Sequence, residues 1–395
     1  MSSIDSARAL LTAEAVRAQC ARVTQHVRSG GGVFELHEDA LDGCAEHVVA
    51  VTLGQYPSLD IPYHSRWRHF AASGATELET RLLDHLAGLE ATEAARVGVD
   101  LVIPSVLLDA GAGPDWAFTA PGSATAIGRS EGLGLASLDM FLNGAFSTDG
   151  SARTEAAALL ELSEVALADG FQVSETNPLV GLAGRLDIVR SLGSAIEQRP
   201  DVFPNGRPGD IVDALAHPDA GALLELVLDV LAPIWPERLV RDNLSLGDAW
   251  FYPPFGDGLD AIVPFHKLSQ WMTYSLAETL ERNGIAVSGL ERLTGLPEYR
   301  NGGLLFETGV LALRDPALAE IKHQPDSQLI VEWRALTVTL LDEVAARVRV
   351  LLDRPELQLA EILEGGTWAA GRALAFARTP SGTPPLHLDS DGTVF

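Results

Sequence analysis

The chain has 395 residues, and 47% of them are hydrophobic, which is enough to bury a sizeable core as one large domain or two of ordinary size. Its 54 acidic residues outnumber the 28 basic ones and give a formal net charge of -26, which argues against nucleic acid and anionic membrane as partners. The two cysteines, Cys20 and Cys44, form no CxxC pair, so neither a disulfide scaffold nor a thiolate zinc site is indicated.

Apolar residues recur at helical spacing in six segments of the chain. We expect helices over residues 5–28, 77–91, 153–169, 210–232, 264–283 and 326–353. Strand signals are sparser: the best are His47–Leu53 and Leu101–Leu108, and Gly302–Leu313 resembles a hairpin. The pattern therefore predicts a mainly α fold with a minor β component.

No Pro/Gly-rich connection is long enough to establish a domain boundary. We interpret residues 1–395 as one domain, with two helical lobes of about 1–205 and 206–395 as the alternative. The N-terminus lacks the basic start and apolar core of a signal peptide, and the apolar runs are shorter than the roughly 20 residues that span a bilayer. A cytoplasmic protein whose last residues, Val394 and Phe395, tuck into the fold is expected.

The octet YHSRWRHF, residues 63–70, is the most basic and aromatic segment of this acidic chain. Guanidinium groups form paired hydrogen bonds to phosphate, and aromatic faces stack on rings or sugars. His64, Arg66, Trp67 and Arg68 are therefore candidate ligands of a phosphorylated, nucleoside-like substrate. The alternative is a surface helix start whose arginines pair with nearby carboxylates.

Residues 106–113, VLLDAGAG, resemble the first motif of methyltransferases that use S-adenosylmethionine, in which a strand enters a Gly-rich turn. The third glycine of such motifs is missing, and Pro114 stands where a helix would begin. Asp109 is either a pocket residue or an acid of a Gly-rich turn.

Residues 128–139, GRSEGLGLASLD, predict a helix whose small residues permit close packing. Its free N-terminal amides are able to hold an anion, with Arg129 and Glu131 as polar contacts. Helix packing alone also explains the glycines.

The segment from Leu246 to Thr273 places Asp248 and Trp250 before a loop and His266 before a helix. Lys267, Gln270 and Trp271 then share one helix face, because they are spaced at i, i+3 and i+4. Polar side chains on such a face are costly to bury without partners, which a ligand or a hydrogen-bond network at the helix start provides.

Residues 293–305, LTGLPEYRNGGLL, concentrate chemistry in one turn. Glu298 is the best candidate for a general base, because a carboxylate can orient water and offset charge on a sugar carbon. Tyr299 and Arg300 are candidate substrate contacts, and the alternative is a Glu/Arg surface pair. HExxH, P-loop and complete GxGxxG motifs are absent from the sequence, so we expect neither a metal nor a cofactor.

Six strings together resemble the family of the fourth protein of the microbial uracil-catabolism pathway, a family formerly of unknown function. They are LDAGAG (108–113), RSEGLGLASLDMF (129–141), SLGDAW (245–250), PFHKLSQWMTYSL (264–276), LTGLPEYRNGGLL (293–305) and SDGTVF (390–395). The likeness covers roughly residues 30 to 395. It implies a role after uracil has become a ribonucleotide and its ring has been opened, when a ribosylurea species must be split.

A partial likeness to queuosine-salvage nucleotide N-glycosidases, a mainly helical family similar to DNA glycosylases, points the same way. It rests on Lys267 and Gln270 in PFHKLSQ and on PEYR, where that family has an Asp-Tyr-Arg turn. Glu298 then takes the place of the catalytic acid, with a side chain one methylene longer.

The resemblances imply a hydrolase that cleaves ribosylurea or its 5-phosphate. Glu298, assisted by Asp248 or Asp109, would activate water, and Lys267 with arginines would hold the phosphate. Aromatic walls are expected from Trp67, Trp250 and Trp271. The alternatives are the methyltransferase and a non-catalytic protein that binds the ligand for another enzyme.

Overall fold

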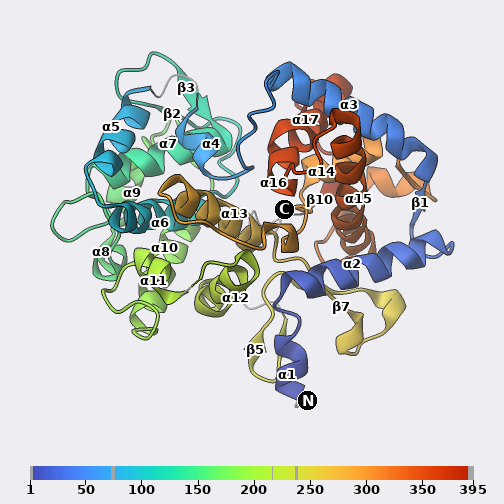
Figure 1. Ribbon diagram of the computed structural model, residues 1–395, viewed down its shortest axis with the longest axis horizontal. Helices are drawn as coiled ribbons and strands as arrows, with labels where there is room; N and C mark the ends of the chain where they lie inside the picture. Colours follow the sequence, from blue (N-terminus) through green and yellow to red (C-terminus); the bar gives the residue numbers. More distant parts are fainter. Residues whose placement is uncertain (1–2, 73–75, 216, 236–238, 390–395) are drawn as a thin grey trace. The chain divides into compact units, whose positions relative to one another are not determined.

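The computed structural model describes residues 3–72, 76–215, 217–235 and 239–389 (Figure 1). The chain divides into two compact units, each built from separate segments. Unit 1 comprises Met1–His64, Glu237–Gln270 and Gly289–Phe395, and unit 2 comprises Ser65–Pro236 and Trp271–Ser288. Segments from both ends of the chain therefore belong to unit 1. The string at 390–395, with Val394 and Phe395, lies outside the described residues.

Unit 1 is built around the long helix α15, which packs against α2, α3 and α14 (Figure 1). Helix α17 packs in turn against α14 and α3. The helices of unit 1 are α1 (Ser3–Arg8), α2 (Ala13–Arg28), α3 (Leu41–Gln55), α14 (Tyr299–Glu307), α15 (Gln328–Leu352), α16 (Leu359–Ile362) and α17 (Trp368–Arg378). A π-helical turn, η8 (Leu363–Thr367), joins α16 to α17.

Unit 2 is almost entirely helical. Helix α6 packs against α5, α7 and α10, and α10 also packs against α8 and α12. Its helices are α4 (Trp67–Phe70), α5 (Thr76–Ala87), α6 (Ala91–Leu107), α7 (Arg129–Leu142), α8 (Ala156–Glu161), α9 (Glu164–Gly170), α10 (Leu182–Glu197), α11 (Ile211–Ala214) and α12 (Ala220–Leu231). Helix α13 (Lys267–Arg282) begins in unit 1 and continues in unit 2.

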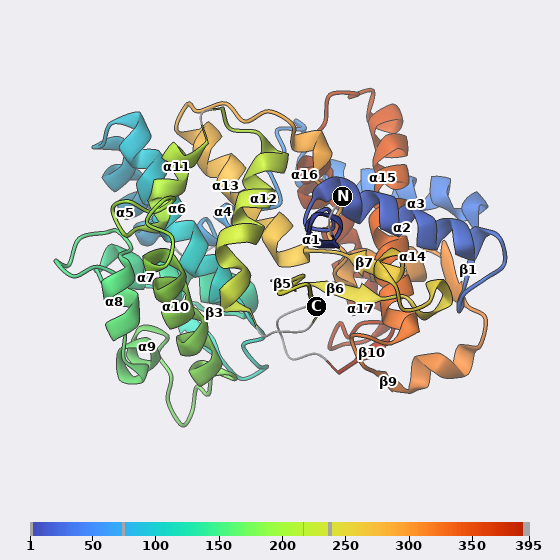
Figure 2. The same ribbon diagram turned by 90° about the horizontal axis from the view of Figure 1, so that it is seen from below.

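Within the described ranges, every sheet has two strands. In unit 1, the hairpin of β6 (Ala249–Phe251) and β7 (Ile262–Pro264), labelled in Figure 2, pairs Trp250 with Val263 and leads into α13. The other antiparallel pairs are β1 (Phe34–Leu36) with β8 (Leu311–Leu313), β4 (Val240–Arg241) with β5 (Leu244–Ser245), and β2 (Ala117–Thr119) with β3 (Ala126–Gly128). Strands β9 (Lys322–His323) and β10 (His387–Leu388) run parallel.

The predicted fold class is confirmed: the protein is mainly α with a minor β component. Helices occur in all six segments where the apolar spacing is helical. No helix of the described part of the chain is long and apolar enough to cross a membrane.

The strand predictions at His47–Leu53 and Leu101–Leu108 are wrong, because these residues lie in α3 and at the end of α6. In α6 every residue from Leu101 to Leu107 is buried, so the continuous apolar run reflects a helix enclosed on all sides. The first half of the expected hairpin at Gly302–Leu313 is the end of helix α14, and only its last residues, Leu311–Leu313, form a strand. The spacing of apolar residues alone does not distinguish a short buried strand from a buried helix.

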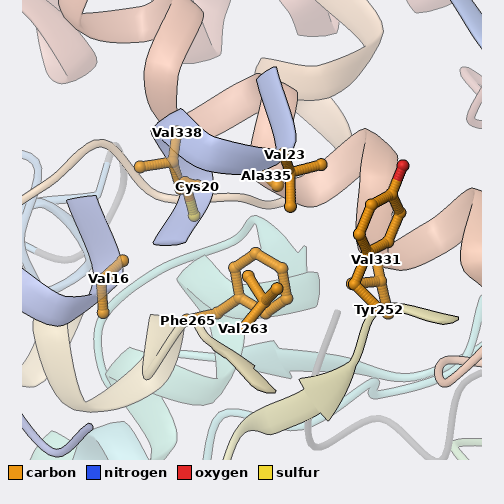
Figure 3. Close-up of a cluster of buried hydrophobic side chains, with 9 residues drawn as sticks. All are labelled: Val16, Cys20, Val23, Tyr252, Val263, Phe265, Val331, Ala335 and Val338. Atoms are coloured by element: carbon orange, nitrogen blue, oxygen red, sulfur yellow. The ribbon is translucent and has the colours of Figure 1, made fainter. Parts of the chain in front are cut away.

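A cluster of buried side chains joins the helices of unit 1 to the β6–β7 hairpin (Figure 3). It consists of Val16, Cys20, Val23, Tyr252, Val263, Phe265, Val331, Ala335 and Val338. The Tyr252 hydroxyl donates to the Glu332 carboxylate over 2.7 Å, so the polar atom at the edge of the cluster is satisfied. The hairpin and the start of α13 are thereby fastened to α2 and α15.

Replacing Gly371 in α17 with alanine is expected to lower the free energy of unfolding by about 1–3 kcal/mol. A Cβ at this position would lie 2.0 Å from the backbone oxygen of Arg300, so α17 and α14 must move apart. Thermal and urea unfolding measure the change. The matched control is Gly43→Ala in α3, where a Cβ meets nothing within 4 Å, and its effect should stay within about 1 kcal/mol. Equal effects at both positions would contradict close packing of α17 on α14.

Candidate functional site

Glu298 is the N-cap residue of α14 and anchors the candidate site in unit 1. Its backbone is extended, and its carboxylate accepts hydrogen bonds from the amides of Arg300 at 2.7 Å and Asn301 at 2.5 Å. These bonds satisfy amides that a helix start leaves unpaired, and they fix the carboxylate orientation. The side chain is partly buried rather than standing in open solvent.

Burial raises the pKa of the Glu298 carboxyl above its ordinary value. The two amide hydrogen bonds, the ammonium of Lys267 and the ring of His64 favour the ionised form, but they do not cancel the effect of burial. Lys267 and His64 therefore lie close enough to Glu298 to act on its charge. A carboxylate with a raised pKa beside a cation suits acid or base catalysis.

Asp248 holds the start of α13, where Lys267 is the first residue. Its carboxylate accepts from the Lys267 amide at 3.1 Å, and its backbone oxygen accepts from the amides of Phe265 at 2.9 Å and His266 at 3.2 Å. The position of Lys267 therefore depends on Asp248. Asp248 comes just before the β6–β7 hairpin in the chain, and Lys267 comes just after it.

Arg334 of α15 forms a bidentate ion pair with Asp248, with nitrogen–oxygen distances of 2.8 and 2.7 Å. The guanidinium also lies over the Phe265 ring at 4.1 Å, and the indole of Trp250 donates to Asp248 at 2.8 Å. Burial alone would raise the pKa of Asp248, but Arg334 outweighs it and holds that pKa well below the usual range. Asp248 is therefore an ionised anchor, poorly suited to giving a proton.

His266, through Nε2, and Gln270, through its amide group, make hydrogen bonds inside unit 1. His266 has a φ of 49°, is buried, and has its Nε2 2.9 Å from the Leu10 oxygen. Burial lowers its pKa. The Gln270 amide donates to the Phe265 oxygen at 3.0 Å and to the Thr294 hydroxyl at 2.7 Å, and it accepts from the Thr294 amide at 2.8 Å. Gln270 thereby ties α13 to the loop that leads to Glu298.

Glu364 is a residue of this region that sequence analysis missed. Its carboxylate lies 2.8 Å from Nδ1 of His64 and accepts from the Tyr56 hydroxyl at 3.3 Å. The His64 ring also lies 5.8 Å from that of Trp368. Glu364 stands in the π-helical turn, a conformation often found at functional sites. The only sequence signal is the Gly365-Gly366 pair that follows it.

The π-helical turn is locked to both α3 and α14. A Cβ on Gly366 would lie 2.5 Å from the Thr52 hydroxyl, so the turn packs directly on α3. The Thr367 hydroxyl donates to the Asn301 side-chain oxygen at 2.9 Å, and the Asn301 amide is a partner of Glu298. One turn therefore positions both Glu364 and the helix that carries Glu298.

Arg300 and Tyr299 lie on the first turn of α14. Arg300 is buried, donates to the Gly382 oxygen at 3.1 Å, and lies 4.6 Å from the Tyr299 ring centroid and 5.9 Å from that of Phe376. Tyr299 also lines a cavity of about 420 Å³. The other lining residues are Glu320, Lys322, Trp333, Thr383, Pro384, Leu386, His387 and Leu388.

In unit 2, Arg66 is fully buried instead of lying on a surface helix. It donates to the Asp109 carboxylate at 2.6 Å and to the Ser105 hydroxyl at 2.7 Å. Burial lowers the pKa of Arg66, and the charges of Asp109 and Glu131 oppose this effect. Asp109 follows helix α6, whereas the methyltransferase motif that its sequence resembles has a strand at this position.

The other predicted residues of unit 2 lie around α13 and α7. Trp67 donates to the Thr279 hydroxyl at 2.9 Å, and Arg68 pairs with Glu278. Trp271 stands 5.7 Å from the ring of His69. Arg129 is exposed, with a φ of 58° at the start of α7, where Glu131 also lies.

The structure thus gathers the predicted residues into two groups. Unit 1 holds Glu298, Asp248, Lys267, His64, His266, Gln270, Trp250, Tyr299 and Arg300, whereas unit 2 holds Asp109, Arg66, Trp67, Arg68, Trp271, Arg129 and Glu131. In the part of the chain that the structure describes, no three His, Cys, Asp or Glu side chains are grouped to hold a metal ion.

Fold and site define a mainly α protein with a partly buried carboxylate at a helix N-terminus, whose ionised form a lysine and a histidine favour. The chain belongs to the family described as "Protein of unknown function (DUF1688)", whose model matches residues 9–395. It is 39% identical over 414 residues to "Protein urg3" of Schizosaccharomyces pombe, with 100% of both chains covered. It is 36% identical over 407 residues to "Uracil catabolism protein 4" of Lachancea kluyveri, with 92% of each covered. The resemblance to the uracil-catabolism family is confirmed.

Asp248→Asn is expected to lower the free energy of unfolding by about 3–5 kcal/mol at pH 7, because Arg334 would be buried without its counter-charge. Since Asp248 has a depressed pKa in the folded state, its contribution is present above the pKa of the unfolded chain and is lost as acid protonates the carboxylate. The difference between variant and wild type should therefore shrink at low pH. Urea unfolding measures it, and the exposed Asp257→Asn is the control. Similar losses in both variants would rule out a special role for the ion pair.

Proposed function

We propose that this protein acts in uracil catabolism as an N-ribosyl hydrolase that splits ribosylurea, or its 5-phosphate, into urea and ribose or ribose 5-phosphate. The pathway is supported by the similarity to "Uracil catabolism protein 4" of Lachancea kluyveri. The reaction class is supported by one observation above all: Glu298 is a partly buried carboxylate with a raised pKa, oriented by two amides and flanked by Lys267.

In the proposed reaction, the ionised Glu298 accepts a proton from a water molecule that attacks the anomeric carbon. The bond between that carbon and the urea nitrogen breaks, and the positive charge that develops on the sugar lies beside the carboxylate. Because the two amides already orient the carboxylate, little reorganisation is needed as charge develops.

Lys267 provides positive charge next to the carboxylate, where it favours the ionised base and can bind a sugar hydroxyl or phosphate. Asp248 and Arg334 act indirectly in this proposal, because they hold the start of α13 and hence Lys267. Gln270 acts in the same way on the Glu298 loop through Thr294.

Glu298→Gln is expected to reduce urea release from ribosylurea 5-phosphate by at least about 100-fold, since the amide cannot accept the proton. Binding should largely persist, because glutamine keeps the shape of the side chain and one of the two oxygens that accept from the helix amides. Purified protein, a coupled urea assay and calorimetric binding give the two quantities. Glu291→Gln, an exposed position of unit 1, is the matched control and should keep full activity.

Two results would contradict the proposed function. If the wild-type protein is stabilised by ribosylurea 5-phosphate but releases no urea, it is a non-catalytic ligand-binding protein. If Glu298→Gln turns over like the wild type, the base lies elsewhere.

The rate should fall as pH decreases through a value above the ordinary pKa of a glutamate, because protonation of Glu298 removes the base and its pKa is raised. Lys267→Gln should move this acid limb to higher pH, since the ammonium favours the carboxylate anion. Profiles of kcat/KM from about pH 4 to pH 8 measure both effects. A limb that stays in place in the lysine variant would show that Lys267 does not act on the catalytic base.

A further inference from the structure

Cleavage of an N-ribosyl bond to urea needs a proton donor as well as a base, because a departing urea anion is a poor leaving group. Glu298 cannot serve as both in one step, since it must be ionised to accept the proton of water. Asp248 is excluded as the donor, because Arg334 holds it ionised and occupies both of its oxygens. The structure therefore has to supply a second group near Glu298.

His64 meets this requirement. Its ring contacts Glu364 of the π-helical turn, and Thr367 of the same turn binds Asn301, whose amide donates to the Glu298 carboxylate. The His64 side chain is 14% exposed, so the ring is packed but accessible. Histidine is the side chain most often used for general acid–base catalysis, which favours His64 over Lys267 as the acid.

The ring orientation is set by Glu364. Since Nδ1 of His64 lies 2.8 Å from the Glu364 carboxylate, Nε2 is the nitrogen left for a ligand. The backbone amide of His64 donates to the Ala360 oxygen at 2.9 Å, and the Tyr56 hydroxyl donates to the other oxygen of Glu364 at 3.3 Å. A base, an acid and a carboxylate that orients the acid follow the general arrangement of hydrolytic sites.

The π-helical turn couples the two halves of this arrangement. Glu364 orients His64, while Thr367, three residues later, binds Asn301, whose amide holds Glu298. A π turn widens the helix by one residue, which places Glu364 and Thr367 differently from an α-helix. The turn packs closely on α3, because a Cβ on Gly365 would lie 3.2 Å and one on Gly366 2.5 Å from the Thr52 side chain.

We infer that His64 is the general acid of the proposed hydrolysis and that Glu364 is its positioning residue; the inference rests on the proposed function. In the step, Nε2–H of His64 protonates the departing urea nitrogen as the carbon–nitrogen bond breaks. The water oxygen bonds to the anomeric carbon, and its proton passes to Glu298. The neutral imidazole and the protonated carboxyl then return to their starting states by exchange with solvent.

The test is His64→Gln, measured with ribosylurea 5-phosphate in single-turnover cleavage and in calorimetric binding. The cleavage rate should fall about 100- to 10,000-fold while the Kd stays within about threefold of the wild type. Glu364→Gln keeps a hydrogen-bond acceptor but loses the charge, and it should lower the cleavage rate about 10- to 100-fold, again with little change in Kd. His37→Gln, an exposed histidine of unit 1, is the control.

A substrate that needs no protonated leaving group gives an independent readout. With 4-nitrophenyl riboside 5-phosphate, both variants should cleave within about threefold of the wild type, whereas Glu298→Gln should remain impaired. Loss of binding, or an equal loss on both substrates, would show a structural role and overturn the inference. If Glu298→Gln is inactive but His64→Gln keeps its rate on ribosylurea 5-phosphate, only this inference fails; if the wild type releases no urea, the proposed function fails first.

Discussion

The ion pair between the partly buried Asp248 and the buried Arg334 is the interaction on which the candidate site depends. Removing a carboxylate and a guanidinium from water costs free energy unless the two groups form hydrogen bonds with each other. Here they do so in a bidentate ion pair. The Asp248 carboxylate also accepts hydrogen bonds from the Trp250 indole and the Lys267 amide. One pair therefore determines where helix α13 begins and where Lys267 stands.

A second set of contacts brings the catalytic candidate to that lysine. Gln270, one turn into α13, bonds to Thr294 at the start of the loop that ends in Glu298. From the other side, Asn301 links the first turn of α14 to the π-helical turn. The carboxylate is thus held by a helix start whose position is set from two directions, which is how a rigid scaffold preorganises charge.

The sequence pointed to part of this region through its residue types. Glu298 stood out as a carboxylate in a turn that concentrates chemistry, and Lys267 as a charged residue on a helix face that is costly to bury; the structure puts both residues in unit 1. Glu364 could not be found in this way, since an acid between a leucine and two glycines is ordinary in a chain with 54 acidic residues. Only the fold shows that a π turn brings it to His64, 300 positions away. The strand prediction at Leu101–Leu108 failed because an enclosed helix and a central strand are equally apolar.

By itself the sequence determined the helical fold class, the acidic surface charge and the segments that carry chemistry, since these follow from periodicity and composition. The tertiary structure alone decided which charges are bonded to each other. Asp248 and Glu298 are both acids within the segments that carry chemistry, yet one forms an ion pair with an arginine and the other accepts hydrogen bonds from the amides of a helix start. The difference arises from α15, whose Arg334 is 86 positions from Asp248, because a pKa depends on neighbours in space rather than in sequence.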